Sequence, residues 1–277
     1  MMLRSVIVVT LAVGLSACAS VERLALPKPT LLSENFALQT PTQTEQVNYA
    51  TYDQFLTKYW SKDASGIARV DYKAVGATDQ ADLASFIDQL QGIDPGNLAR
   101  DDQLAYWINL YNAQTIRVVL DAYPVDSIRE IKDGPLKIGP WNRKDVVVNG
   151  TALSLNDIEH HIIRPTFNEP RIHYALNCAA TSCPNLAPQA WRGAGLDAAL
   201  EAAELSYLAD DRGISIGADG RVTASKIYIW FREDFGANER EVLARLIRKS
   251  SDAKAAALRA RGRIDRYEYD WSLNEAR

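Results

Sequence analysis

The sequence predicts an α+β fold, a single globular domain with a buried central helix and a small, mostly antiparallel sheet. Three observations predict it. Residues 102–122 are apolar on nearly every side of a helix, which is typical of a helix buried in a core. Segments that alternate like strands are few and lie scattered among helical segments, which argues against a doubly wound sheet. From Tyr49 onward there is no internal repeat and no second linker, so one domain accounts for this part of the chain.

The other helices are predicted from apolar residues that recur three and four positions apart. This spacing predicts helices over residues 52–60, 79–90, 154–164, 196–208 and 239–247. Ser154 is the expected N-cap of its helix, because a serine hydroxyl accepts a hydrogen bond from a free N–H of the first turn. Asp157 favours the same start, since its charge is attracted to the positive end of the helix dipole. Pro165 is expected to end this helix.

Short strands are predicted at residues 67–72, 146–148, 171–176 and 221–223, with an extended segment at 263–271. Asn149 and Gly150 follow the second of these strands and predict a tight turn, because this pair tolerates the left-handed backbone that two-residue hairpin turns need. Residues 226–231 fit either a strand or a helix.

The predicted central helix contains three amide side chains, those of Asn109, Asn112 and Gln114. A buried amide must find hydrogen-bond partners or it lowers the stability of the fold. One interpretation is that these amides tie the helix to neighbouring backbone. The other is that one of them faces a functional cleft.

The N-terminus has the pattern of a secretory signal. Arg4 precedes an apolar run over residues 6–15, which is too short to span a bilayer of about 30 Å as a helix. The run ends in Leu15-Ser16-Ala17-Cys18, which resembles the lipobox of bacterial lipoproteins, where the cysteine is acylated and becomes the first residue of the mature protein. Several acyl chains on one cysteine anchor a protein stably.

This resemblance divides the chain into a signal peptide (residues 1–17), the lipidated Cys18 with a flexible tether (18–48) and the globular domain (49–277). The tether is expected from its prolines and its lack of periodic apolar residues. In enteric-type sorting, an aspartate directly after the acylated cysteine opposes transport to the outer membrane. Ala19 occupies this position, so we expect the protein to be located at the periplasmic face of the outer membrane. The membrane, reached through lipid on Cys18, is then the first predicted partner.

Composition narrows the functional classes further. The net charge is −4, with 47% apolar and 24% charged residues, which is ordinary for a soluble globular domain. A nucleic-acid-binding protein needs a basic excess or a basic stripe, whereas lysine and arginine are here mixed with acidic residues, so no nucleic-acid partner is predicted. No cofactor is predicted.

Imidazole and thiol groups concentrate in one segment, since all three histidines lie between residues 160 and 173 and Cys178 and Cys183 follow. Three interpretations remain open. In the first, Cys178 and Cys183 form a disulfide, which the oxidising periplasm favours and four intervening residues allow. In the second, Cys183 or Cys178 is a nucleophile, with His173 or His160 as its base.

In the second interpretation, Glu159 or Asp157 orients the base, and Asn112 is a further candidate for orienting or stabilising the reacting groups. The third interpretation is a metal site that uses Glu159, the histidines and the thiols. Zinc sites usually show Cys-x₂₋₄-Cys pairs or histidines four positions apart. His160 and His161 are adjacent and no His-Glu-x-x-His motif is present, so no metal site is predicted.

Four ordered motifs resemble the domain of unknown function family numbered 547 and extend over about residues 49–274. They lie at residues 104–113, 154–160, 171–184 and 269–274. Tyr106 stands where the family commonly has phenylalanine, and Ala179 lies near a common glycine. The resemblance implies one globular domain in a bacterial envelope protein, and no assigned activity.

A looser similarity to papain-like and transglutaminase-like hydrolases implies a nucleophilic cysteine at the start of the buried helix. This helix has no cysteine, so that similarity implies either a permuted order, with His173 before Cys183, or an inactive site. Fold analogy is a weak argument for function.

Two functional hypotheses follow. The first is a lipoprotein with a binding or scaffold role in the cell envelope, whose partner is an unknown envelope protein or peptide ligand. The second is a cysteine-dependent hydrolase or acyltransferase that acts on an envelope peptide or amide.

Overall fold

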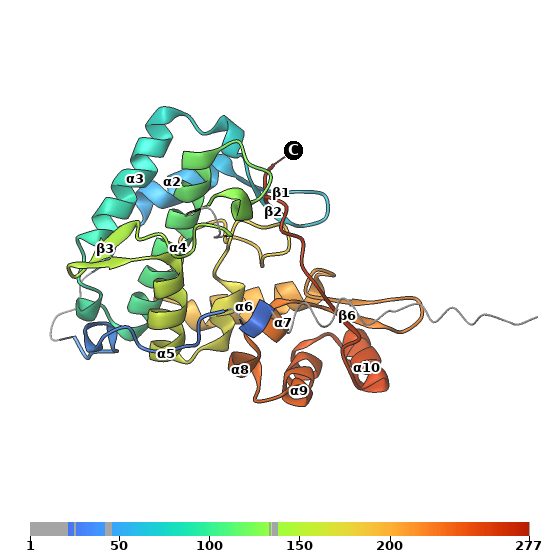
Figure 1. Ribbon diagram of the computed structural model, residues 1–277. Helices are drawn as coiled ribbons and strands as arrows, with labels where there is room; N and C mark the ends of the chain where they lie inside the picture. The colour runs from blue at the N-terminus through green and yellow to red at the C-terminus, as the bar shows by residue number, and fades with distance from the viewer. Residues whose placement is uncertain (1–21, 25, 42–45, 133, 135–137, 277) are drawn as a thin grey trace, which may run out of the picture.

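Helix α4 (Arg100–Ala122) forms the centre of the fold. Every residue from Gln103 to Ile116 is buried, which confirms the predicted central helix. Helix α3 (Ala77–Gln91) packs against α4, and α2 (Ala50–Tyr59) packs against α3, so that the three helices make one end of the molecule (Figure 1). The amphipathic spacing of α2 and α3 places their apolar residues toward this core.

The structure is a computed structural model that describes residues 22–24, 26–41, 46–132, 134 and 138–276. Within these ranges the fold is mostly helical. Besides α2, α3 and α4, the helical segments are η1 (Glu34–Phe36), η2 (Tyr72–Ala74), η3 (Pro95–Asn97), η4 (Ile128–Glu130), η5 (Asp157–Ile163), α5 (Arg164–Phe167), η6 (Pro170–Tyr174), α6 (Leu196–Ala209), α7 (Ile227–Trp230), α8 (Arg232–Phe235), α9 (Glu239–Lys249) and α10 (Asp252–Arg261).

The strands form three small sheets in the described chain, where the sequence predicted one. Strand β1 (Trp60–Lys62) pairs antiparallel with β2 (Ala68–Val70), and β3 (Val146–Val148) pairs antiparallel with β4 (Thr151–Leu153). The third sheet has the order β5 (Ile214–Ile216), β6 (Val222–Ser225) and β7 (Arg266–Glu268), with β6 and β7 parallel. The sheets stay separate because strands of three or four residues pair mainly with their neighbours in the chain.

Local signals account for several of these elements. Asn149 and Gly150 have φ values of 49° and 72°, so the predicted tight turn joins β3 to β4. The Ser154 hydroxyl accepts a hydrogen bond from the Asp157 N–H at 3.2 Å, and the Asp157 carboxylate accepts one from the Ser154 N–H at 2.7 Å. This reciprocal capping box confirms the predicted helix start and fixes the orientation of η5.

Residues 226–231 were predicted as either a strand or a helix, and they are mainly the helix α7. Two predictions about local structure need correction. Residues 171–176 were expected to be a strand, but Pro170 at the helix start and the Glu169 carboxylate, which accepts the Arg171 N–H at 2.9 Å, begin the 3₁₀ helix η6 instead. The helix expected to end before Pro165 continues through the wide π-type turns of η5 into α5, where Pro165 occupies the first turn.

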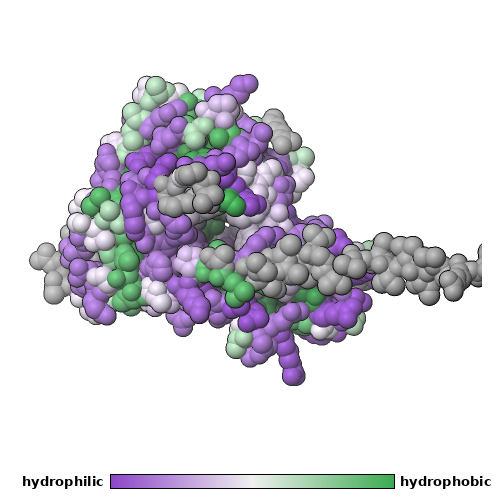
Figure 2. Space-filling view, in the orientation of Figure 1, coloured by the Kyte–Doolittle hydropathy of each residue, from purple (hydrophilic) through white to green (hydrophobic). Residues whose placement is uncertain are grey.

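Two clusters of buried apolar residues build the core of the described chain. The larger cluster surrounds α4 and includes residues of α2, α3 and η5. The smaller one joins the three-stranded sheet to α8, α9 and α10, at the other end of the molecule in Figure 1. Most of the surface facing the viewer in Figure 2 is hydrophilic, with hydrophobic residues in separate patches. A cavity lies where the two clusters meet, and it is the candidate functional site.

The segment expected to be a tether contacts the domain over its described residues. The backbone N–H of Leu32 donates to the His161 carbonyl at 2.8 Å, and Phe36 is only 3% exposed. The Glu22 carboxylate binds Lys226 and the indole N–H of Trp230, each at 2.9 Å. Cys18 and the predicted signal peptide lie outside the described residues. No helix in the described ranges has the length and apolar character needed to cross a membrane.

Candidate functional site

A cavity of about 350 Å³ opens between the two apolar clusters. Its walls come from parts of the chain that are far apart in sequence: η5, the segment from η6 to Pro184, α7 and both described ends of the chain. This volume is within the range of small-molecule binding sites. Ile138, at the rim, is 61% exposed, although it lines the same cavity.

Aromatic rings make one wall of this cavity. The side chains of Trp230, Tyr269 and Trp271 contact one another, with ring centroids 4.8–5.5 Å apart. Trp141 contacts Trp271 edge to face at 5.6 Å, and Phe231 completes the set. Rings at these distances and angles hold one another in place, so the wall is rigid and apolar.

Glu159 supplies a carboxylate to the cavity from η5. The residue is 8% exposed and lines the cavity. Burial, together with the charge of the neighbouring Glu159 carboxylate, raises the pKa of the Tyr111 hydroxyl well above its usual value. The imidazole Nδ1 atoms of His173 and His160 lie 3.7 and 3.9 Å from Glu159 Oε1. Among the described residues, no lysine or arginine forms an ion pair with this carboxylate.

His173 lies between two carboxylates. Its Nε2 donates to Asp234 Oδ2 at 2.6 Å, its Nδ1 faces Glu159, and its ring stacks on Phe231 with centroids 4.1 Å apart. Burial alone would raise the pKa of Asp234, but hydrogen bonds from His173 and Arg164 hold it well below its usual value. The imidazole is therefore fixed on both sides and cannot turn without breaking the bond to Asp234.

His160 is the neighbour of this group and is uncharged at neutral pH. Arg164 Nη1 donates to its Nδ1 at 3.2 Å, which only a deprotonated nitrogen can accept. Burial, with a smaller effect of the positive charge of Arg164, lowers the pKa of His160 to about 4, although the Glu159 carboxylate acts in the opposite direction.

The opposite side of the cavity holds the two sulfurs. Cys178 and Cys183 form a disulfide, so the structure has the first of the three interpretations of this segment. Cys183 is buried and Cys178 is half-buried, and both line the cavity. The hydroxyl of Tyr269 lies 3.2 Å from Cys178 Sγ and 3.0 Å from Cys183 Sγ. Cys183 Sγ also accepts the backbone N–H of Cys178 at 3.1 Å.

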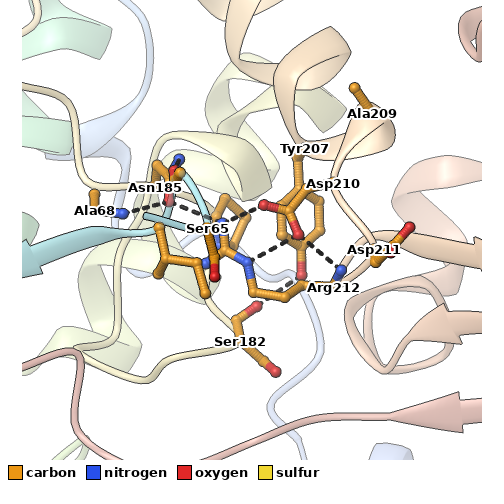
Figure 3. A network of polar contacts seen from close by, with 12 residues as sticks. Ser65, Ala68, Ser182, Asn185, Tyr207, Ala209, Asp210, Asp211 and Arg212 are labelled. Atoms are coloured by element: carbon orange, nitrogen blue, oxygen red, sulfur yellow. Dashed lines mark hydrogen bonds and ion pairs between the residues drawn. The ribbon is translucent and has the colours of Figure 1, made fainter. Parts of the chain in front are cut away.

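Arg212 does not line the cavity but binds the backbone of the disulfide loop. Figure 3 shows its guanidinium with Asp210 and Asn185. Its guanidinium donates to the carbonyl oxygens of Thr181 and Cys183 at 2.8 and 3.0 Å and to the side chain of Asn185 at 2.9 Å. Asp210 holds the guanidinium in this position by an ion pair of 2.7 Å. The planar fork of arginine suits several fixed acceptors at once.

Asn112 does not line the cavity. Its amide N–H₂ donates to the Ala175 carbonyl and its amide oxygen accepts the Asn177 N–H, both at 2.9 Å. This is the structural interpretation of the buried amides: Asn112 ties α4 to neighbouring backbone. Of the predicted site residues, the cavity brings together Cys178, Cys183, His173 and Glu159.

Several residues of the site were missed by the sequence analysis. Asp234 belongs to a short polar helix without a motif, and its contact with His173 joins positions 61 residues apart. The aromatic wall had a visible signal in the aromatic-rich segments 226–231 and 269–271, which we interpreted only as secondary structure. In the described ranges, no group of three or more His, Cys, Asp or Glu side chains could hold a metal ion.

Residues 95–208 match the model of the family described as "Protein of unknown function, DUF547". This confirms the predicted resemblance for that region, which contains η5, η6 and both cysteines but ends before α7 and residues 269–274. No curated protein and no solved structure gives a significant match to the chain. A papain-like or transglutaminase-like arrangement therefore stays a prediction.

The neutral His160 makes stability depend on pH. In the unfolded chain histidine binds a proton near pH 6.5, whereas the pKa of His160 in the fold is about 4. Between these values the unfolded state binds more protons, so the free energy of unfolding falls as the pH falls, by about 3 kcal/mol in total. Urea unfolding at a series of pH values should show that His160→Gln makes this slope shallower.

His161→Gln, at the adjacent half-buried position, is the comparison variant for the loss of one imidazole from the same helix. A slope that stays the same in His160→Gln would contradict a neutral, buried His160.

Proposed function

We propose that this protein is an outer-membrane-anchored periplasmic lipoprotein that binds a small organic cation, an amine or guanidinium group on an apolar body, in the cavity beside Glu159. The observation that carries the proposal is the combination in one cavity of a buried carboxylate with a wall of tryptophan, tyrosine and phenylalanine rings. The ligand can be a free molecule or the side chain of an envelope peptide.

The charge of Glu159 supports a cationic ligand. A buried carboxylate is costly unless a cation or several hydrogen bonds compensate it. Glu159 has the Tyr111 hydroxyl as a neighbour, and the imidazole nitrogens of His173 and His160 lie beyond hydrogen-bond distance, at 3.7 and 3.9 Å. A ligand ammonium would give the Glu159 carboxylate hydrogen bonds and a compensating positive charge.

The aromatic wall supports the same ligand class. The faces of tryptophan and tyrosine attract a cation, by about 2 kcal/mol where water is excluded, and they also bury an apolar body. The cavity is large enough for one ring or a short aliphatic chain with its charged group.

Binding of 2-phenylethylamine tests this proposal against its neutral isostere 2-phenylethanol. We expect the amine to bind about tenfold more tightly, because only it gains the contact with Glu159. Quenching of tryptophan fluorescence measures both affinities, since Trp141, Trp230 and Trp271 line the cavity. Glu159→Gln should remove the preference for the amine.

Glu268→Gln, which changes an exposed carboxylate outside the cavity, is the control and should keep the preference. Equal affinities for the amine and the alcohol in the unchanged protein would exclude a cation site.

The location rests on the lipobox-like residues around Cys18 and predicts a simple fractionation result. Cys18→Ser removes the acylated atom, so we expect the variant in the soluble fraction and the unchanged protein with the outer membrane. Immunoblotting of separated membranes measures both. Ala19→Ser, a matched change beside the acylated residue, should not alter the distribution, and a Cys18→Ser variant that stays on membranes would contradict the anchor.

A cysteine-dependent hydrolase or acyltransferase is the second candidate, because both sulfurs, His173 and Glu159 line one cavity. It needs prior reduction, since neither sulfur is a free thiol in the disulfide. After reduction we expect hydrolysis of peptide anilides that Cys183→Ala abolishes while the domain still unfolds cooperatively. Reduced, folded protein without such activity would exclude the hydrolase.

A further inference from the structure

The hydroxyl of Tyr269 lies against both sulfurs of the disulfide and inside the ligand cavity. It is 3.2 Å from Cys178 Sγ and 3.0 Å from Cys183 Sγ, and within the described chain these sulfurs are its hydrogen-bond partners. Contacts with Trp230 and Trp271 hold its ring. A structural disulfide needs no hydrogen-bond donor at its sulfurs, whereas a disulfide that is cleaved to a thiolate does.

We propose that Cys178–Cys183 is a reactive disulfide that exchanges with a thiol entering the cavity, with Cys178 as the attacked sulfur and Cys183 as the leaving thiolate. The substrate class is a thiol compound or a cysteine of an envelope protein. This activity does not depend on a cationic ligand.

The surroundings of the two sulfurs are unequal, and this sets the direction of attack. Cys178 is half-buried in the cavity wall, so an incoming thiolate can reach it, while Cys183 is buried. Cys183 Sγ has two donors, the backbone N–H of Cys178 at 3.1 Å and the Tyr269 hydroxyl. Among the described residues, the Tyr269 hydroxyl is the only donor to Cys178 Sγ. Negative charge is therefore better stabilised on Cys183, and the better-stabilised thiolate leaves faster.

Burial also keeps the tyrosine in its donor form. It raises the pKa of Tyr269 well above the usual value, so the hydroxyl remains protonated when a thiolate forms beside it.

The exchange is balanced in two steps. The thiolate of the substrate forms a bond to Cys178 Sγ while the Cys178–Cys183 bond breaks, and the electron pair of that bond goes to Cys183. A second substrate thiolate then attacks the substrate sulfur of the mixed disulfide and releases Cys178 as a thiolate. The two substrate thiols are oxidised to a disulfide, and the protein takes up their two electrons and two protons.

The loop is held so that the two cysteines stay close after cleavage. The Asn177 side chain accepts the Ala179 N–H and donates to the Pro184 carbonyl, both at 2.9 Å, which links the two sides of the loop. Arg212, which does not line the cavity, donates hydrogen bonds to the carbonyl groups of Thr181 and Cys183. Cys183 is thus placed to attack a mixed disulfide on Cys178 and close the original bond again.

The test treats the folded domain with 2-mercaptoethanol, a neutral thiol, which keeps the test independent of Glu159. Free thiols are alkylated at short times under acid quench, and fragmentation mass spectrometry locates the adduct. We expect the mercaptoethanol adduct on Cys178 and alkylation on Cys183, with near-UV circular dichroism unchanged. Tyr269→Phe should slow the first step about tenfold, through loss of one hydrogen bond to the leaving thiolate.

Tyr267→Phe is the matched control, because Tyr267 is a buried tyrosine of β7 that contacts neither sulfur, and its rate should be unchanged. An adduct on Cys183, an equal distribution, an unchanged rate in Tyr269→Phe, or reduction only after unfolding in urea would each overturn the proposal.

The single-cysteine variants give a second readout if Tyr269→Phe fails to fold. In Cys178→Ser the remaining Cys183 keeps both donors, whereas in Cys183→Ser the remaining Cys178 keeps one. The pH profile of alkylation should therefore give Cys183 the lower pKa, and the reverse order would overturn the assignment of the leaving sulfur.

Discussion

Two asparagine amides buried on α4 hold the ends of the segment that carries the disulfide. Asn109 donates to the Trp191 carbonyl at 2.8 Å and accepts the Trp191 N–H at 2.9 Å. Asn112 makes the equivalent pair of bonds at Ala175 and Asn177. The backbone at Trp191 and at Ala175–Asn177 is irregular, so no neighbouring strand bonds its N–H and carbonyl groups. Each amide bonds one of these carbonyls and one of these N–H groups, which lowers the cost of burying them. The sulfurs, η6 and the cavity wall all depend on these four bonds for their position.

A row of charged and imidazole side chains lies between the two apolar clusters. Glu159, His173, Asp234 and Arg164 follow one another from the cavity to α8, and His160 contacts Arg164 from the side. Because these groups are largely buried, each one fixes the protonation or orientation of the next. Glu159, His173 and His160 of this row line the cavity, and Glu159 is the carboxylate among them, whereas Asp234 forms an ion pair with Arg164.

The sequence predicted most helices because their apolar spacing is a local property. The central helix, the Ser154 capping box and the turn at Asn149 were all read correctly for that reason. The helix η6 was not predicted, because the side chains from Arg171 to Leu176 alternate as in a strand. Pro170 and the Glu169 cap instead start a 3₁₀ helix there. The clustering of histidine and cysteine located half of the site. Asp234 and, apart from Trp141, the rings of the aromatic wall come from the last third of the chain, and only long-range packing brings them to His173 and the sulfurs.

The cavity walls extend in sequence from Glu22 to Trp271, so no shorter fragment of the chain contains the whole site. The family-matched region 95–208 has the sulfurs and Glu159 but lacks Trp230, Tyr269 and Trp271. A molecule that occupies the cavity therefore has nothing comparable to bind in the unfolded chain. By mass action, a ligand that binds only the folded state raises the free energy of unfolding. The increase is about 2.7 kcal/mol when the free ligand concentration is a hundred times the dissociation constant. The melting temperature of the intact domain is thus a direct detector for unidentified ligands, and compounds from an envelope extract can be ranked by it without any assumption about what they are.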